Sequence, residues 1–77
     1  MKQFVIEETH TWKRKDGTEA TMKSYFKEFT TFVYPLIHLA NIDECKKYGT
    51  RAEALIDWRK YFRHKKTSKI VQINSNN

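Results

Sequence analysis

The dipeptide Asp16-Gly17 constrains the fold of this chain more than any other feature, because it lies between two long segments that resemble strands. Asp-Gly between alternating apolar residues is a strong signal for a β-hairpin, since glycine accepts the left-handed backbone that tight turns require. The alternation predicts antiparallel strands over 2–13 and about 19–29, with Val5 as the one residue that does not fit the pattern.

The length of the hairpin loop follows from which residues it would place opposite each other. A two-residue Asp-Gly loop would set Trp12 against Thr21, an apolar ring against a polar side chain. A three-residue loop over 15–17, with Gly17 left-handed in a bulge, sets Trp12 against Ala20 instead. Because a slip of one residue turns every side chain to the other face of the sheet, we expect the three-residue loop.

Two further segments have strand character. Residues 30–34 are β-formers, but Pro35 excludes the interior of a central strand there. Either an edge strand covers roughly 32–39 or a helix begins at Pro35. Residues 68–74 predict a last short strand, which we expect to return beside the first.

Capping patterns predict two helices between these strands. Residues 41–49 are expected to form a short helix that Gly49 terminates. Thr50 and Glu53 then match a capping box, which predicts the start of a longer helix over about 51–64.

The expected fold is therefore α+β, a small antiparallel sheet packed on one long and one short helix. The sheet consists of the hairpin and one or two further strands, and the order is strand, strand, optional strand, helix, helix, strand. We expect a single domain over 1–73 and a frayed tail over 74–77. Aromatic residues make up 14% of the 77 residues, so the small core is expected to contain large rings.

The charge balance and the single cysteine limit the classes of partner. The chain has 15 Lys and Arg against 9 Asp and Glu, a net charge of +6. This balance favours polyanions or acidic protein surfaces as partners, and it is equally consistent with simple solubility. Cys45 alone cannot form an intramolecular disulfide, and no apolar run at the N-terminus resembles a signal peptide. We therefore expect a cytoplasmic protein.

No catalytic or metal-binding pattern is visible. His10, His38 and His64 are far apart and lack metal-ligand spacing, and there is no glycine-rich phosphate loop. Glu7 and Glu8 are adjacent on a strand, so they point to opposite faces and cannot act together as acid and base. We expect no enzymatic activity, no cofactor and no metal.

Clustered cations are the main functional signal. They occur at the hairpin tip, on the outward face of the second strand and at the end of the longer helix. The candidate nucleic-acid contacts are Lys13, Arg14, Lys15, Lys23, Lys27, Arg59, Arg63, Lys65 and Lys66. On the second strand, Tyr25 lies between two of these lysines, an arrangement that resembles a platform for single-stranded nucleic acid. Each cluster also has an explanation without nucleic acid. The cations at the end of the longer helix could stabilise the helix dipole, and the other cations could form an ordinary solvated surface.

The longer helix has an apolar arc wider than one sheet face covers. Trp58 and Tyr61 widen that arc to more than half the circumference, so we expect part of it to be exposed for a partner. Trp58, Tyr61 and the strand residue Tyr25 are the candidate partner-binding residues. The two helix rings are also candidate contacts for a homodimer.

The chain resembles small accessory proteins encoded by phages and prophages. The resemblance lies in the segments "HTWKRKDGTEATMKSYFKEFT", "IDECKKYGTRAEALIDWRKYF" and "SKIVQI", and at the helix start in Tyr48, Thr50, Glu53 and Ala54. It implies a non-catalytic protein that binds and modulates or inhibits a host protein or defence complex, such as a nuclease, a polymerase or a CRISPR-type complex. The alternative, which depends on the cations, is a module that binds DNA or RNA.

Overall fold

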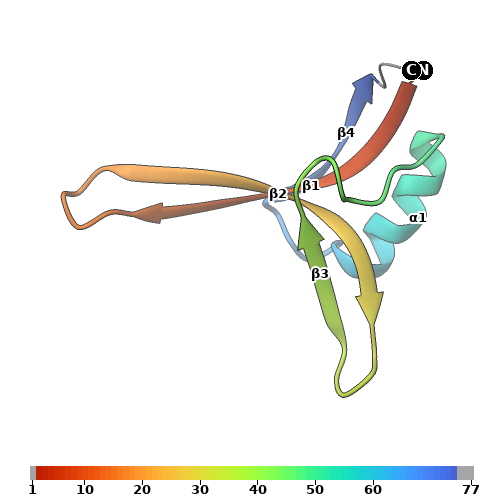
Figure 1. Ribbon diagram of the computed structural model, residues 1–77, viewed down its shortest axis with the longest axis horizontal. Helices are drawn as coiled ribbons and strands as arrows, with labels where there is room; N and C mark the ends of the chain where they lie inside the picture. The colour runs from red at the N-terminus through yellow and green to blue at the C-terminus, as the bar shows by residue number, and fades with distance from the viewer. Residues whose placement is uncertain (1, 75–77) are drawn as a thin grey trace.

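The computed structural model describes residues 2–74, which form a four-stranded antiparallel sheet and one helix (Figure 1). The elements are β1 (Lys2–Lys13), β2 (Glu19–Thr30), β3 (Leu36–Ala40), α1 (Arg51–Tyr61) and β4 (Ser68–Asn74). The strand order across the sheet is β3-β2-β1-β4, so the last strand does return beside the first, as predicted. Asn74 belongs to β4, and the rest of the predicted tail, 75–77, lies outside the described residues.

The expectation of two helices was wrong, because the structure contains one short helix and is mostly sheet. Asn41 starts only a single turn: its Oδ1 accepts hydrogen bonds from the backbone N–H groups of Asp43 and Glu44 at 3.1 and 3.0 Å. The chain then leaves the helical path because the backbone N–H groups of Lys46 and Tyr48 donate to the strands, at 2.9 and 2.8 Å. These N–H groups therefore bond to the sheet and not to the preceding turn, so no helix forms.

The longer helix is also shorter than the predicted 51–64. It begins as expected, with the Thr50 side chain accepting a hydrogen bond from the Glu53 backbone at 3.2 Å. It ends at Tyr61, and the fully buried Phe62 leaves helical geometry with φ −122° and ψ 1°. The residues that follow turn back toward β4, so the last three positions of the expected helix form a turn.

The hairpin has the predicted three-residue loop. Trp12 lies opposite Ala20 in the ladder between β1 and β2, and Arg14 N–H donates to Thr18 O at 2.8 Å. Gly17 has φ +89°, the left-handed conformation that the loop requires. The segment after Pro35 is an edge strand rather than a helix, but it covers 36–40 instead of the predicted 32–39, and residues 32–35 belong to the turn before it.

The sheet divides into three limbs away from its centre, formed by β1 with β2, by β1 with β4 and by β2 with β3 (Figure 1). The ladder between β1 and β2 extends from Glu7 and Tyr25 to the hairpin end, while the first half of β1 pairs with β4. In the gap left beside β1, Phe4 and Tyr48 exchange two backbone hydrogen bonds of 2.9 and 2.8 Å. Lys46 N–H also donates to Phe26 O of β2, so residues 46–48 bridge the first half of β1 and the second half of β2, which explains why the chain leaves the turn there.

The core lies between the sheet and α1. Its buried members are Ile6, Phe26, Tyr48, Ala54 and Phe62. Val5 is also fully buried although its parity is opposite to that of Ile6, so β1 is covered on both faces at its centre. This double burial explains why Val5 does not fit the alternation. Within 2–74, no helix is long and apolar enough to cross a bilayer.

Candidate nucleic-acid interface

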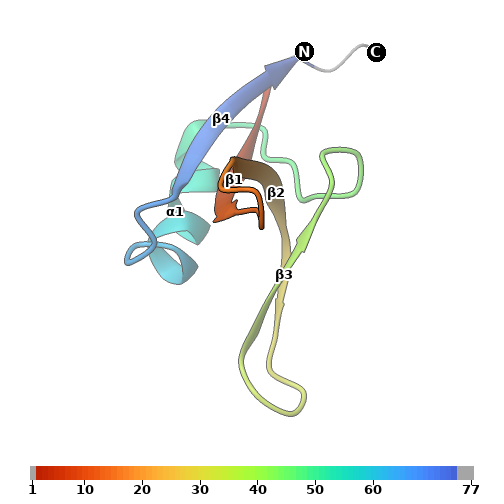
Figure 2. The same cartoon turned by 90° about the vertical axis from the view of Figure 1, so that its left-hand side faces the viewer.

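The outer half of the first hairpin projects from the body of the molecule (Figures 1 and 2). We call residues 9–23 the arm. The pairing of β1 with β4 stops at Glu8 and Ser68, and the pairing of β2 with β3 starts only at Tyr25. The arm is therefore a two-stranded ribbon that neither β3 nor β4 flanks, and Figure 2 views it end-on.

The two faces of the arm differ in chemistry. Trp12 and Met22 are about half exposed, at 48% and 54%, and belong to the parity that faces the core further along the strands. The opposite face carries polar side chains such as Thr11 and Thr21, whose hydroxyl groups lie 3.4 Å apart. The arm thus extends the apolar face of the sheet beyond the region that α1 covers.

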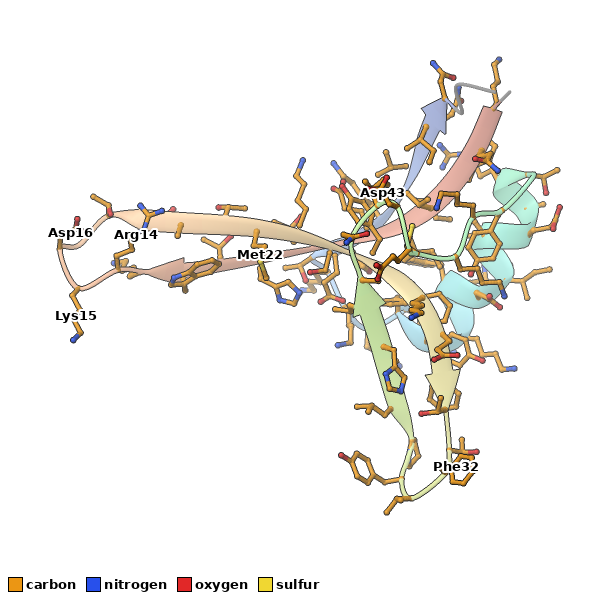
Figure 3. The ribbon with its side chains drawn as sticks, in the orientation of Figure 1. Arg14, Lys15, Asp16, Met22, Phe32 and Asp43 are labelled. Atoms are coloured by element: carbon orange, nitrogen blue, oxygen red, sulfur yellow. The ribbon has the colours of Figure 1, made fainter. Side chains whose placement is uncertain are left out.

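The tip of the arm presents three cations. Lys13, Arg14 and Lys15 are all exposed, and the Lys15 side chain points away from the ribbon (Figure 3). Asp16 Oδ1 accepts hydrogen bonds from the Thr18 hydroxyl at 2.7 Å and from its backbone N–H at 3.0 Å. These bonds hold the pKa of Asp16 below its usual value, so the tip carries one fixed negative charge among its cations.

A second group of cations lies at the root of the arm. We call residues 62–67, between α1 and β4, the basic turn; it carries Arg63, Lys65 and Lys66. Thr67 O accepts a hydrogen bond of 3.0 Å from Thr9 N–H, the first residue of the arm. The structure therefore attaches the basic turn directly to the arm, although Thr9 and Thr67 are 58 positions apart in the sequence.

The net charge of the protein comes entirely from the end of the chain. Residues 59–74 contain six Lys and Arg and no Asp or Glu, whereas residues 2–58 contain nine of each. Every ion pair in the described part of the chain involves the carboxylate of Glu7 or Asp57. The exposed cations of the last turn of α1 and of the basic turn are not among these pairs. They are Arg59, Lys60, Arg63, Lys65 and Lys66.

The predicted platform on the second strand is tied to a buried carboxylate. Lys23 Nζ lies 3.9 Å from Glu7 Oε1, and the Tyr25 hydroxyl donates to Glu7 Oε2 at 3.4 Å. Burial and then the charge of Glu7 raise the pKa of Tyr25, so its hydroxyl stays protonated. Lys27 lies where the pairing of β2 with β3 shifts register. The three residues therefore do not form a free row of cations around an exposed ring.

Trp58 and Tyr61 pack against the sheet. The indole N–H of Trp58 donates to Ser68 Oγ at 3.1 Å, and the Tyr61 ring stacks on Phe29 with centroids 4.6 Å apart. Both side chains are half-buried against the core. Ile56, at 67% exposure, is the large apolar residue that α1 exposes.

Sequence reasoning missed the apolar turn between β2 and β3. Phe32 is 99% exposed and Val33 88%, and Tyr34 beside them is 62% exposed. The available signal was the absence of charged residues over 29–42, which is unusual in a chain with 31% charged residues.

The described residues contain no group of three or more His, Cys, Asp or Glu side chains that could hold a metal ion. Cys45 is buried, and this burial raises the pKa of its thiol, which disfavours the reactive thiolate. His38 Nε2 lies 2.9 Å from the Thr30 hydroxyl in the sheet. The chain matches no protein-family model, and searches of curated proteins and solved structures gave no significant match.

Proposed function

We propose that this protein binds double-stranded DNA, with the arm in a groove and the basic turn on adjacent phosphates. The observation that carries the proposal is the location of the unpaired cations: the segment that supplies the whole net charge is hydrogen-bonded to the root of a projecting ribbon. Clustered Lys and Arg on one part of a small domain are the electrostatic feature that nucleic-acid-binding proteins share.

The dimensions of the arm support a duplex as the ligand. From Thr9 to Lys13 the strand advances four residues, about 13 Å at ~3.3 Å per residue, and the turn extends beyond it. A two-stranded ribbon fits the major groove, which is about 12 Å wide. Cations at the root would position the protein on the backbone, while the exposed arm residues would face the base edges. We expect binding without catalysis, in the cytoplasm of the cell that makes the protein.

The test is the salt dependence of binding to a fluorescently labelled DNA duplex, measured by anisotropy. Two triple substitutions to Gln remove the proposed contacts: Lys13, Arg14 and Lys15 in the tip variant, and Arg63, Lys65 and Lys66 in the turn variant. Each should weaken binding and reduce the slope of log K against log salt by roughly 2–3 units, since each phosphate contact contributes about 0.9.

A matched control removes three charges elsewhere. The control variant carries Gln at Lys2, Lys47 and Arg51, exposed cations outside the arm and the basic turn. Its slope should stay close to that of the native protein. The proposal fails if the native protein does not bind the duplex at physiological salt, or if all three variants lose binding equally.

A protein partner is the second candidate, favoured by the exposed apolar face of the arm. In this reading, the protein modulates or inhibits a host protein or defence complex through Trp12 and Met22. Pull-down from a nuclease-treated bacterial lysate separates the two candidates. A partner that is retained after nuclease treatment and lost on Trp12→Ala, but not in the tip variant, would replace the DNA proposal.

A further inference from the structure

The turn between β2 and β3, together with β3, concentrates the exposed apolar surface of the protein. Five of the eight exposed large apolar residues between positions 2 and 74 lie within 32–39. They are Phe32, Val33, Tyr34, Leu36 and Leu39. Figure 3 shows the Phe32 side chain at the end of this limb, remote from α1 and from the arm. Contiguous apolar exposure of this kind marks an interaction surface.

The strand next to this turn is a sheet edge without charged residues. β3 pairs only with β2, and residues 29–42 contain no Asp, Glu, Lys or Arg. The other edge strand, β4, carries Lys69 and the polar residues Gln72 and Asn74. Natural proteins place charges on edge strands to prevent pairing with another chain. The edge at β4 follows this rule, whereas the edge at β3 does not.

We propose that a second copy of this chain covers β3, with the two β3 strands pairing antiparallel about a two-fold axis at His38. In that register Leu36 lies opposite Ala40 of the other copy and Ile37 lies opposite its Leu39. Such an interface is self-complementary, as a two-fold dimer requires, and it joins two four-stranded sheets into one. The exposed turn residues beside β3 lie next to this seam.

The charge distribution selects a second copy over other occupants. Two molecules of net charge +6 repel each other, so they associate best where neither presents a charge, and 29–42 is such a segment. An acidic partner would instead be attracted to the basic turn, on a different part of the chain. A lipid surface would require cations next to the apolar turn. The nearest cations in the sequence are Lys27 and Lys46, so the turn lacks them and a lipid surface is disfavoured.

The test is sedimentation velocity over a wide range of protein concentration. The native protein should show a monomer–dimer equilibrium. The substitution His38→Lys places two like charges directly opposite each other at the axis. It should raise the dimer Kd more than about tenfold, since like charges across an interface are strongly unfavourable. The control Gln72→Lys adds the same charge to the other edge strand and should leave Kd within about twofold.

A native protein that stays monomeric over the whole range would overturn the proposal, as would a dimer that His38→Lys does not weaken or that Gln72→Lys weakens equally. Because His38 contacts Thr30, circular dichroism must show that the substituted monomer is folded. If the substituted monomer is unfolded, amide exchange of 36–40 in the native protein tests the dimer instead. Protection of these amides should rise with protein concentration, and an unchanged protection contradicts the dimer. A monomer that instead pellets with anionic phospholipid vesicles also contradicts it. The inference is independent of the proposed DNA binding.

Discussion

Tyr48 donates its phenolic hydrogen to Asp57 Oδ2 across 2.6 Å, and this bond joins the 41–49 segment to α1. Lys46 Nζ reaches the same oxygen at 3.1 Å. Burial of the ring, and then its bond to the carboxylate, raise the pKa of Tyr48 well above its usual value. Burial acts to raise the pKa of Asp57, but the hydrogen bonds from Tyr48 and Lys46 outweigh it and lower the pKa overall.

Tyr48→Phe should lower the free energy of unfolding by ~1–3 kcal/mol, because it removes a hydrogen bond to a charged group and leaves the packing of the ring unchanged. Urea denaturation would show a lower midpoint at unchanged slope. The control is Tyr34→Phe, since Tyr34 lies in the exposed turn before β3. Equal effects of the two substitutions would show that the bond to Asp57 does not stabilise the fold.

The lowered pKa of Asp57 also predicts how stability depends on pH. Its stabilising contribution is complete above the ordinary value of 3.8 and is lost as pH falls below 3.8 through the lower pKa of the folded state. The melting temperature of the native protein should therefore fall steeply as pH decreases through this acidic range. In Asp57→Asn the melting temperature should fall less over the same pH range. If the variant loses as much as the native protein, Asp57 does not cause the acid sensitivity.

Thr50→Ala should cost about 0.5–2 kcal/mol, the usual value for loss of an N-cap. The Thr50 hydroxyl accepts from the Glu53 backbone N–H at 3.2 Å and donates to Glu53 Oε1 at 3.1 Å, so both hydrogen bonds between the two residues depend on it. Chemical denaturation measures the effect, with Thr31→Ala in the exposed turn before β3 as the control. No difference between the two variants would mean that the cap does not hold the helix start.

Gly17→Val should destabilise the arm by roughly 1–3 kcal/mol, because a β-branched residue is strained at φ +89°. The matched control is Gly49→Ala: Gly49 has no left-handed φ, and an added Cβ would meet only Glu53 Oε1 at 3.7 Å. We expect the control to be neutral or slightly stabilising. Amide exchange of 9–23 and the melting temperature measure the effect of each substitution. Equal effects would mean that the turn does not need a left-handed residue at position 17.

Tyr61→Ala should destabilise the protein by about 2 kcal/mol or more, because its ring stacks on Phe29 and Phe26 in the core. Trp12→Ala removes an aromatic ring that is 48% exposed on the arm and should cost much less. Thermal melts compare the two directly. A larger loss for Trp12 would mean that the arm, rather than α1, contributes the critical packing.

The local features of the hairpin were predictable from the sequence. Asp16-Gly17 and the pairing of Trp12 with Ala20 specified the loop length, because turn chemistry and side-chain parity act over a few residues. The start of α1 was predictable for the same reason, since Thr50 and Glu53 form a cap within four positions. The cations of the tip and of the basic turn were identified individually, but nothing local indicated that Thr67 binds Thr9 and joins the basic turn to the root of the arm.

The sequence by itself thus determined the hairpin register, the helix start and which residues are charged, all of which depend on neighbours along the chain. Only the tertiary structure decided that 41–49 does not form a helix, because the backbone bonds of Tyr48 go to Phe4, which is far away in the sequence. It also decided that Tyr61 is packed and Phe32 exposed. Burial depends on what the rest of the chain places over a residue: Phe29 of β2 lies against the Tyr61 ring, whereas no described residue covers the Phe32 ring.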